Sequence, residues 1–473
     1  MNVREDLAKS EVLERVGSCA DTLGLETYVV GGYVRDMFLK RESKDIDFVC
    51  LGDGIELAKK VASSFKQRVP LSVFKNFGTA MISWDGWELE FVGARKESYS
   101  PDSRKPTVDQ GTLQEDLERR DFAINAMAVS VNKETFGNLL DPFDGLGDLK
   151  KKTIRTPLEP GITFSDDPLR MMRAVRFASQ LQFDIDPDTF DGIIRNAHRL
   201  EIVSGERIIA ELNKIIASDK PSYGFKLLFV GKLLHQFFPE MVELQGVDSV
   251  GDQSHKDNFY HTLQVLDNVA SVSANLWLRW AAIMHDIAKP LTKRFSEKSG
   301  WTFHGHEDKG ARMTPGIFRR LKLPMDERMK YVQKLVRLHL RPIALVNDKV
   351  TDSALRRLLY EAGDDIEDLM TLCRADITSK NNSKVKRFLA NFDKVEKKLQ
   401  EVESKDQLRN FQPPVSGEEI METFGLRPSK TVGELKEEIK EAILEGKINN
   451  NKTEAIELMH KLAAKKGIIK TEN

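Results

Sequence analysis

Apolar residues in the first third of the chain recur in short runs separated by polar stretches. The runs VVGG, DIDFVCLG, GTAMISW, WELEFVGAR and INAMAVSV have the length and residue types of strands. Residues 55–66 have helical spacing instead. The polar segment from Arg95 to Glu115, with Pro101 and Pro106, predicts a mobile loop. This part of the chain is therefore predicted to form a small domain of strands and helices.

The pattern becomes helical further along the chain. From 166 to 240 apolar positions recur every three or four residues, the region 250–385 is helical and rich in histidine, and 386–473 is mainly charged helix. We therefore predict an α+β protein with four domains: a head with a mixed sheet and flanking helices, then all-helical neck, third and tail domains, at 1–150, 151–245, 246–385 and 386–473.

The composition excludes several classes of protein. The 473 residues include only 3 cysteines, too few for a disulfide framework. The sequence has no apolar run near the ~18 residues of a membrane span and no signal-peptide core, so we expect a cytoplasmic protein without a membrane partner. At a net charge of −1, a nucleic acid would need local basic patches. The candidate patches are Lys150–Lys152, Lys380–Arg387 and Lys461–Lys466.

Two aspartates stand at alternate positions of one predicted strand. In VVGGYVRDMFLKRESKDIDF, residues 29–48, the carboxylates of Asp45 and Asp47 point to the same face, about 7 Å apart along the chain. Hard divalent ions take oxygen ligands, and two ions can clamp the attacking and leaving oxygens of a phosphoryl transfer. The preceding Gly31-Gly32 turn lets backbone N–H groups approach phosphates. This segment therefore predicts a Mg²⁺ site beside a phosphate site.

The same segment, with GGxVRD ahead of the aspartates, resembles the nucleotidyltransferase superfamily that includes DNA polymerase β. Within it the segment resembles class II, the tRNA CCA-adding enzymes and bacterial poly(A) polymerases. The resemblance implies a polymerase-β-like palm in which Asp45 and Asp47 are catalytic and hold Mg²⁺. Such palms often add a third acid from a neighbouring strand, for which Glu90 in WELEFVG is the candidate, an outward-facing carboxylate being the alternative. The nucleotide-binding residues implied here are Gly31, Gly32, Arg35 and Asp36.

A second motif, RRDFAINAMA at residues 119–128, matches the family pattern RRDxxxNAxA. In the family this motif helps to hold the ribose and phosphates of the nucleotide. Arg120 can give a forked contact to phosphate, and Asn125 offers a donor and an acceptor to a ribose hydroxyl. With Asp121 between them, these residues are expected to bind the nucleotide.

A third motif, DDPLRMMRAVRFASQLQF at residues 166–183, resembles the family's EDxxR element, whose Asp and Arg read the incoming base. Asp166 stands where Glu is usual, while Asp167 and Arg170 match the reading pair. A carboxylate accepts the amino proton of cytosine or adenine and a guanidinium donates to the ring acceptor, so one pair accepts C and A. The alternative is an ordinary i, i+3 salt bridge. The nucleotide-binding residues expected here are Asp167, Arg170, Arg173 and Arg176.

The segment SGERIIAELNKI, residues 204–215, resembles the family's next helix-capping element. Ser204 is a plausible N-cap. Arg207 and Glu211 could support the template helix, although an ordinary amphipathic helix explains them equally well.

Six of the 9 histidines lie between 255 and 339, and their order with His285-Asp286 resembles the HD phosphohydrolase superfamily. The resemblance implies metal-dependent hydrolysis of phosphate esters, with 2′,3′-cyclic phosphates at damaged tRNA ends as one candidate substrate. Imidazole with carboxylate suits Mn²⁺, Ni²⁺, Fe²⁺ or Zn²⁺ better than Mg²⁺. The implied metal ligands, of which His306 and His339 would serve a second ion, are His261, His285, Asp286, His306, His339 and Asp376.

The leading interpretation is an enzyme, a nucleotidyltransferase that adds CCA to tRNA 3′ ends from CTP and ATP by two-metal transfer. Its expected partners are tRNA, CTP and ATP, its tail is expected to bind tRNA, and it is expected to be a monomer or homodimer. A poly(A) polymerase and CC-only or A-only enzymes remain alternatives, although the full-length segment 96–118 argues against CC-only addition. Two further alternatives are a working HD domain beside an inactive RNA-binding head, and an HD domain that is only a scaffold.

Overall fold

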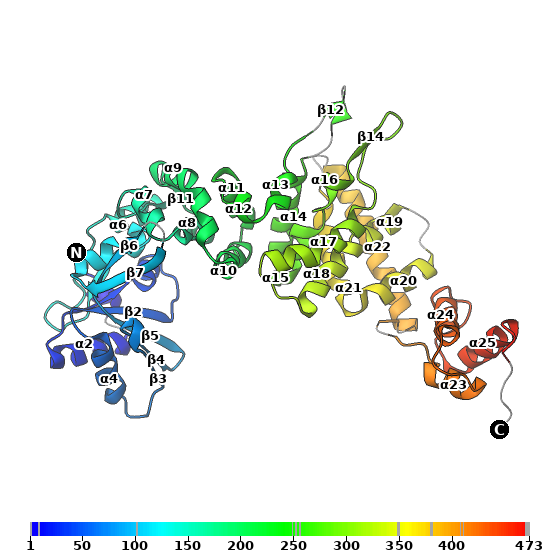
Figure 1. The fold of residues 1–473 in the computed structure, drawn as a ribbon, viewed down its shortest axis with the longest axis horizontal. Helices are drawn as coiled ribbons and strands as arrows, with labels where there is room; N and C mark the ends of the chain where they lie inside the picture. Colours follow the sequence, from blue (N-terminus) through cyan, green and yellow to red (C-terminus); the bar gives the residue numbers. More distant parts are fainter. Residues whose placement is uncertain are drawn as a thin grey trace. The chain divides into compact units, whose positions relative to one another are not determined.

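Figure 1 shows a computed structural model of the chain. It describes residues 2–7, 10–100, 103–247, 249–250, 253–254, 257–347, 351–378, 382–406, 408–409 and 411–468. The chain divides into two compact units, Met1–Pro239 and Glu240–Asn473. One unit is built on a mixed sheet and the other is mainly helical, which confirms the predicted α+β class. Within the ranges given, no helix combines the length and the apolar character that a membrane crossing requires.

The first unit is built on a sheet that, among the residues described, has seven strands in the order β3-β4-β5-β2-β1-β8-β9. The strands are β1 Thr27–Val30, β2 Asp45–Cys50, β3 Leu71–Phe74, β4 Thr79–Trp84, β5 Trp87–Gly93, β8 Ala128–Ser130 and β9 Leu139–Leu140. Neighbours β2 and β5 are parallel, and the other neighbours are antiparallel.

Two helices cover one face of this sheet, α2 Glu11–Leu23 and α4 Gly54–Ser64, and α4 packs against β4 and β5 (Figure 1). The side chain of Asp53 caps α4 by accepting from the N–H groups of Ile55 and Glu56. On the covered face Phe48 and Phe91 are fully buried and stack with ring centroids 5.1 Å apart. Truncating either ring would cost about 3–5 kcal/mol. On the opposite face, Val49 of β2 and Val92 of β5 belong to a second apolar cluster with Leu113 and Leu117, and Asp45 and Asp47 precede Val49 on that face.

The prediction of a mobile loop from Arg95 to Glu115 is wrong. Strands β6 Arg95–Ser100 and β7 Ser103–Gln110 pair as an antiparallel ribbon, and α5 Leu113–Glu118 follows with a capping box at Thr112 and Glu115. A two-stranded ribbon leaves many backbone N–H groups outside the ladder, so a Pro such as Pro106 is tolerated there. Pro101 and Asp102 lie outside the residues described.

The rest of the predicted elements fit closely, with two further differences. INAMAVSV is a strand only at Ala128–Ser130, because Ala123–Asn125 forms a turn of 3₁₀ helix. The short edge strand β3 was not expected, and α3 Gly32–Phe38 starts directly after the Gly31 turn.

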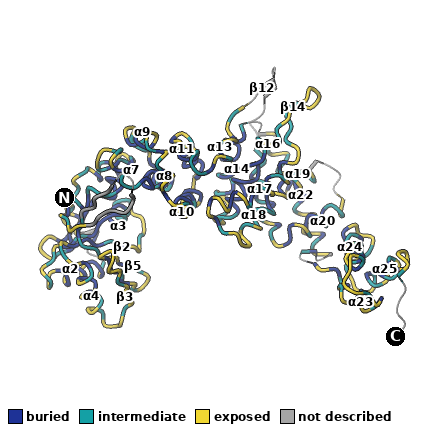
Figure 2. Tube along the Cα trace, in the orientation of Figure 1, coloured by how far each residue is buried: buried dark blue, intermediate teal, exposed yellow. Residues whose placement is uncertain are grey.

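The remainder of the first unit is helical. Its elements are α6 Gly145–Lys151, α7 Pro160–Asp166, α8 Leu169–Leu181, α9 Pro187–Asn196, α10 Gly205–Ile216, α11 Pro221–Val230 and α12 Leu234–Phe237, with a short parallel pair, β10 Thr153–Ile154 and β11 Asp184–Ile185. Helix α8 packs against α10 and α11 and is buried along most of its length (Figure 2). It therefore forms the centre of this helical part.

The second unit is also helical. Its elements after α13 Pro239–Glu243 are α14 Asn258–Ala270, α15 Leu276–Met284, α16 Lys289–Thr292, α17 His306–Arg320, α18 Glu327–Leu338, α19 Leu340–Asn347, α20 Asp352–Ala362, α21 Ile366–Asp376, α22 Asn382–Asp406, α23 Gly417–Phe424, α24 Lys430–Leu444 and α25 Lys452–Lys465. Two small ribbons interrupt them, β12 Ser249–Val250 with β13 Gln253–Ser254 and β14 Arg294–Ser296 with β15 Gly300–Thr302. Helices α14, α15, α18 and α21 pack together around the histidines.

Candidate functional site

The parallel ladder of β2 and β5 brings carboxylates together on the face of the sheet opposite α4. Asp47 is the direct partner of Glu90, and Asp45 is the partner of Glu88. Direct partners in a ladder point to the same face, and Ile46 and Leu89, between them in sequence, are fully buried on the other face. This face therefore carries Asp45, Asp47 and Glu90 side by side, with Glu88 as a neighbour that the sequence did not indicate.

Burial and neighbouring carboxylates raise the pKa of Asp47 and of Glu90. Burial raises the pKa of Asp47; Arg120 opposes this, while Asp45 and Asp116 add to it. Burial and the charge of Asp47 likewise raise the pKa of Glu90. A cation with oxygen ligands would relieve this repulsion. Clustered carboxylate oxygens are the donors that Mg²⁺ takes, so the residues fit a divalent ion.

Gly31 closes one side of the carboxylate cluster. It has a left-handed φ of 73°, and a Cβ at this position would lie 3.0 Å from Nη1 of Arg120 and 3.2 Å from Oδ2 of Asp47. Only glycine lets the backbone lie this close to both groups without strain. The glycine turn, Asp47 of the carboxylate cluster and Arg120 of the second motif therefore lie next to one another.

Arg35 lies in a network rather than in open solvent. Its guanidinium donates to Asp36 at 2.9 and 2.8 Å and to Oδ1 of Asn125 at 2.9 Å. Asn125 donates in turn to Asp121, which also accepts from Nε of Arg173 at 2.7 Å. Burial alone would raise the pKa of Asp121, but Arg173 and Asn125 hold it at about 2. The network connects the sheet to α8.

Asp116 is a central residue that the sequence analysis missed. Its side chain is fully buried and accepts from Arg119 at 2.6 Å and from Arg120 at 3.2 Å. Burial raises the pKa of Asp116, and the two arginines outweigh that effect and lower it. In the sequence LQEDLE, Asp116 has the pattern of an exposed acid on a charged helix. Only the folded structure shows that it orients Arg120.

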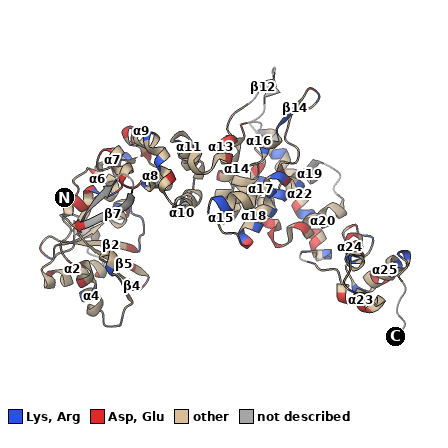
Figure 3. Cartoon of the chain, viewed as in Figure 1, with Lys and Arg blue, Asp and Glu red and all other residues tan. Residues whose placement is uncertain are grey.

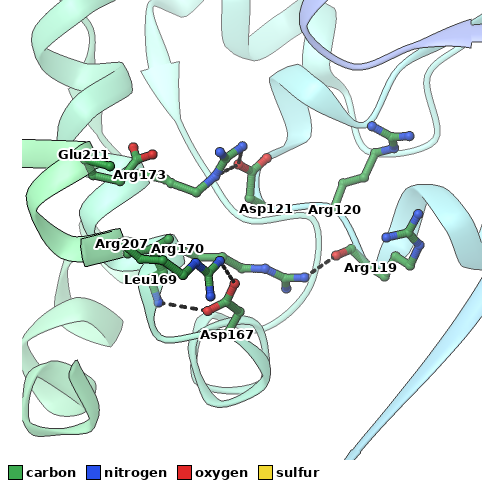
Figure 4. Close-up of a pocket in the computed structure, with 10 residues that line it drawn as sticks. Arg119, Arg120, Asp121, Asp167, Leu169, Arg170, Arg173, Arg207 and Glu211 are labelled. Carbon is green, nitrogen blue, oxygen red and sulfur yellow. Dashed lines mark hydrogen bonds and ion pairs between the residues drawn. The ribbon is translucent and has the colours of Figure 1, made fainter. Parts of the chain in front are cut away.

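A cavity of about 430 Å³ lies between the second and third motifs (Figure 4). This size is within the usual range for small-ligand sites. Five arginines and three carboxylates line it, so it carries an excess of positive charge suited to a phosphate-bearing ligand. The lining residues are Arg119, Arg120, Asp121, Asp167, Leu169, Arg170, Arg173, Arg207, Ala210 and Glu211.

The expected base-reading pair lines this cavity, and each member has other partners. Asp167 accepts from the N–H of Leu169 at 3.1 Å and from Arg207 at 3.2 Å. Arg170 donates to the carbonyls of Arg119 at 2.6 Å and Thr163 at 3.3 Å (Figure 4). The two side chains are thus held in position separately, unlike a simple i, i+3 salt bridge.

Arg176 is the one expected nucleotide ligand of the third motif that does not line the cavity; Gly31, Gly32, Arg35, Asp36 and Asn125 of the first two motifs also lie outside its lining. It is buried, donates to Glu211 at 2.5 Å and lies 3.9 Å from the ring centroid of Phe177. Arg35 and Arg173 lie over the same ring, at 4.9 and 5.4 Å. Phe177 therefore supports three arginines by cation–π contact, a role that its place in an apolar helix did not indicate.

The histidines of the second unit converge on one point. His261 comes from α14, His285 follows α15, His306 starts α17 and His339 follows α18. Nδ1 of His285, His306 and His339 lies 2.7 Å from a backbone carbonyl in each case, and Nδ1 of His261 lies 3.1 Å from Oγ1 of Thr378. These bonds fix each ring so that Nε2 faces inward, as in protein metal sites.

Asp286 lies at the centre of this cluster. One carboxylate oxygen lies 3.2 Å from Nε2 of His285 and 3.5 Å from that of His261, and the other lies 3.2 Å from His306 and 4.0 Å from His339. Two groups with metal-binding geometry result, His261–His285–Asp286 and Asp286–His306–His339. Asp376 adds a contact of 2.8 Å to His261.

The chemistry of this cluster fits divalent metal. In the described part of the chain, Nε2 of His285, His306 and His339 is buried near Asp286 without a well-aligned hydrogen bond, which is costly unless a cation binds it. Burial would raise the pKa of Asp286, but His285 and Lys289 hold it well below its usual value. Lys289, whose Nζ lies 2.5 Å from Asp286, is a further polar residue that the sequence analysis did not single out.

Three parts of the chain match known families. Residues 27–155 match the poly A polymerase head domain, residues 182–244 match a probable RNA and SrmB-binding site of polymerase A, and residues 258–381 match the HD domain.

Curated relatives carry two related names. An A-adding tRNA nucleotidyltransferase of Deinococcus radiodurans is 33% identical over 347 residues, 71% of this chain and 76% of the relative. A multifunctional CCA protein of Shewanella frigidimarina is 33% identical over 320 residues, 64% of this chain and 71% of the relative. An A-adding enzyme of Aquifex aeolicus is 43% identical over 199 residues, 41% of this chain but only 24% of that longer protein.

Solved structures show the same fold. The CCA-adding enzyme of Bacillus stearothermophilus in complex with CTP aligns with a TM-score of 0.67 over 97% of this chain and 99% of that one, at 23% identity. A tRNA nucleotidyltransferase complexed with a primer tRNA and an ATP analog aligns with a TM-score of 0.57 over 81% of this chain and 98% of that one, at 26% identity. The fold and the carboxylate face thus define a nucleotidyltransferase head joined to an HD domain. The chain belongs to the tRNA nucleotidyltransferase family.

Proposed function

We propose that the first unit adds C, C and A to the 3′ end of tRNA from CTP and ATP. The observation that carries this proposal is that Arg120 borders both the carboxylate face and the cavity that holds Asp167 and Arg170. A triphosphate bound at Arg120 would therefore reach the carboxylates while its base faces the reading pair. The resemblance to enzymes solved with CTP and with primer tRNA supports the same arrangement.

The chain's own residues do most of the positioning in this proposal. Arg120, held by Asp116, and Arg173, held by Asp121, offer charged N–H donors to phosphate oxygens. Each oxygen of Asp167 keeps a free lone pair for an amino group, and Arg170 keeps N–H donors beyond the two that bind carbonyls. A divalent ion at Asp45, Asp47 and Glu90 supplies charge neutralisation at the phosphates and activates the 3′ hydroxyl.

Addition of A alone is the second candidate, because relatives from Deinococcus and Aquifex are named A-adding enzymes. Poly(A) addition is a third, since the head matches the poly A polymerase head domain. The test supplies three tRNAs, ending before the CCA, after C, or after CC, with CTP or ATP and Mg²⁺. Addition of CMP to the first two and of one AMP to the third supports CCA addition. AMP addition to the third alone supports an A-adding enzyme, and a long adenosine ladder supports a poly(A) polymerase.

For the second unit we propose a metal-dependent phosphohydrolase. The support is the buried histidine cluster, in which Nε2 of His285, His306 and His339 has no well-aligned hydrogen bond among the residues described. A divalent metal would supply a nucleophilic hydroxide there, and Lys289 would contribute positive charge beside Asp286. The test is release of phosphate or ring opening of 2′,3′-cyclic phosphates by the full-length protein, with Asp286→Ala as the variant that must lose it.

Binding of tRNA by the tail, a cytoplasmic location and a monomeric or homodimeric state are also proposals. Figure 3 shows Lys and Arg interspersed with Asp and Glu over α23–α25, and Lys466 pairs with Glu434 and Glu438. Charge alone therefore marks no RNA face on the tail. The cluster Lys380–Arg387 lies partly outside the part of the chain that the structure describes.

A further inference from the structure

The edge of the catalytic sheet exposes two aromatic rings. Phe74 ends β3 and is 46% exposed, and Phe77 in the turn before β4 is 71% exposed. In the described part of the chain, no other large hydrophobic side chain is as exposed as Phe77. The exposed Lys75 stands between them, and Gly78, with a φ of 61°, closes the turn. We call Phe74, Lys75 and Phe77 the aromatic edge.

The ladder places Phe74 on the same face as the catalytic carboxylates. Asp47 pairs with Glu90, Glu90 with Met81, and Met81 with Ser72, so these four side chains form one row across four strands. Phe74 is two residues beyond Ser72 on β3, and residues two apart on a strand share a face. The face that carries the carboxylates therefore continues to the aromatic edge, and β3 is the exposed edge strand of the sheet (Figure 2).

The distance along this face suits the end of a nucleic acid strand. Strands are about 4.8 Å apart, so three steps separate Asp47 from Ser72 by roughly 14 Å, and two residues along β3 bring the total to about 16 Å. A stacked strand advances about 3.4 Å for each nucleotide. The aromatic edge is therefore a few nucleotides away from a 3′ hydroxyl that reacts at Asp45 and Asp47.

We propose that Phe74 and Phe77 form a stacking platform for a base near the 3′ end of the RNA primer, with Lys75 providing positive charge for the backbone. Unpaired bases stack on exposed aromatic rings, and neighbouring cations bind the phosphates. The carboxylates on the same face repel phosphates, so an RNA crossing this face needs favourable contacts beyond them. The inference rests on the proposed transfer at Asp45 and Asp47, because that reaction brings the RNA end to this face.

The test measures binding of a tRNA ending in CC to the full-length protein, and the KM for this tRNA in ATP addition. Phe77→Ala and Phe74→Ala should each weaken binding by about 5- to 150-fold, the range for loss of one base–aromatic stack. The KM for ATP should not change, and Phe77→Trp should bind like the wild type. Val230→Ala, which truncates another exposed side chain of the same unit (54% exposed), should have no effect.

Single abasic nucleotides placed in turn near the RNA 3′ end then identify the stacked base. One of them should weaken wild-type binding as much as Phe77→Ala does, and should have no further effect on that variant. If Phe77→Ala and Phe74→Ala bind like the wild type, or no abasic position couples to either ring, the platform is overturned. The platform would also be overturned if the wild type is a dimer and Phe77→Ala is a monomer that binds RNA equally well. The aromatic edge would then be a contact with a second copy of the chain.

The experiments distinguish failure of the stacking platform from failure of the proposed nucleotide transfer. Abasic coupling without any nucleotide incorporation would uphold the platform and overturn the transfer. Incorporation without coupling would overturn the platform alone.

Discussion

Asp47 on β2 and Glu90 on β5 are direct partners across a parallel ladder, so their carboxylates lie side by side on the face of the sheet opposite α4. In sequence they are far apart, and only Asp47 belongs to a recognisable motif. The pairing makes Glu90 the strongest candidate for a third acid beside Asp45 and Asp47. Burial raises the pKa of both carboxyl groups, with a further rise from Asp45 and Asp116 at Asp47 and from Asp47 at Glu90.

Glu90→Gln should lower kcat for nucleotide addition by about 100-fold or more, because loss of one metal-binding oxygen removes several kcal/mol of stabilisation. Single-turnover rates across a Mg²⁺ titration measure this. Glu56→Gln, an exposed acid of α4 on the covered side of the sheet, is the control and should be fully active. A Glu90→Gln variant with wild-type rates would leave Glu90 as an ordinary strand carboxylate.

Asp167→Ala and Arg170→Ala should lower kcat/KM for CTP and ATP more than kcat/KM for UTP and GTP, so that the preference for C and A becomes weaker. Each change removes a hydrogen bond that favours cytosine and adenine, worth roughly 1–3 kcal/mol when a partner is left unpaired. The measurement is kcat/KM for all four nucleoside triphosphates on one tRNA. Equal losses of kcat/KM for all four nucleotides would mean that the pair stabilises the fold and does not select the base. Glu201→Gln changes an exposed acid of the same unit and is the control for surface charge.

Asp121 should make stability depend on pH in the acid range. Its pKa in the folded protein is about 2, below the ordinary value of 3.8, so its contribution is present above that ordinary value and is lost as pH falls through the folded pKa. The contribution is about 2 kcal/mol at neutral pH. Urea unfolding from pH 7 to pH 2 should show this loss, and Asp121→Asn should be less stable at pH 7 with a flatter profile. Parallel profiles for the two proteins would contradict this assignment.

The histidine cluster should bind up to two divalent ions that share Asp286. Asp286→Ala should then lose all bound metal, whereas His306→Ala should keep the ion at His261 and His285. Metal analysis of the purified proteins measures this, with the exposed His198→Ala as control. Chelation should also lower the Tm of the wild type, because a ligand bound only to the folded state stabilises it. Full metal content in Asp286→Ala would rule out the shared arrangement.

The sequence predicted the strands that hold the motifs because alternating burial leaves a clear pattern. DIDFVCLG has Ile46 and Phe48 on the covered face and Asp45 and Asp47 on the other, and the fold class followed from such runs. The β6–β7 ribbon was missed because its strands are polar and contain Pro106, so the sequence shows no alternation of apolar and polar residues that would indicate a strand.

Residues that act through three-dimensional neighbours could not be predicted in the same way. Asp116 looks like a surface acid, yet its side chain is fully buried between Arg119 and Arg120. Phe177 looks like a core residue, yet three guanidinium groups lie over its ring. Their roles depend on which elements the fold brings together, and residue type and local spacing carry no information about that.

The central claim is that nucleotide addition takes place on the carboxylate face of the first unit and not in the histidine cluster. The most direct test compares Asp47→Asn with Asp286→Ala, both full-length, on a tRNA lacking CCA with CTP, ATP and Mg²⁺, with products read at single-nucleotide resolution. We predict that Asp47→Asn adds no nucleotide and that Asp286→Ala adds C, C and A at the wild-type rate. Addition that survives Asp47→Asn, or that is lost in a folded Asp286→Ala protein, would contradict the account.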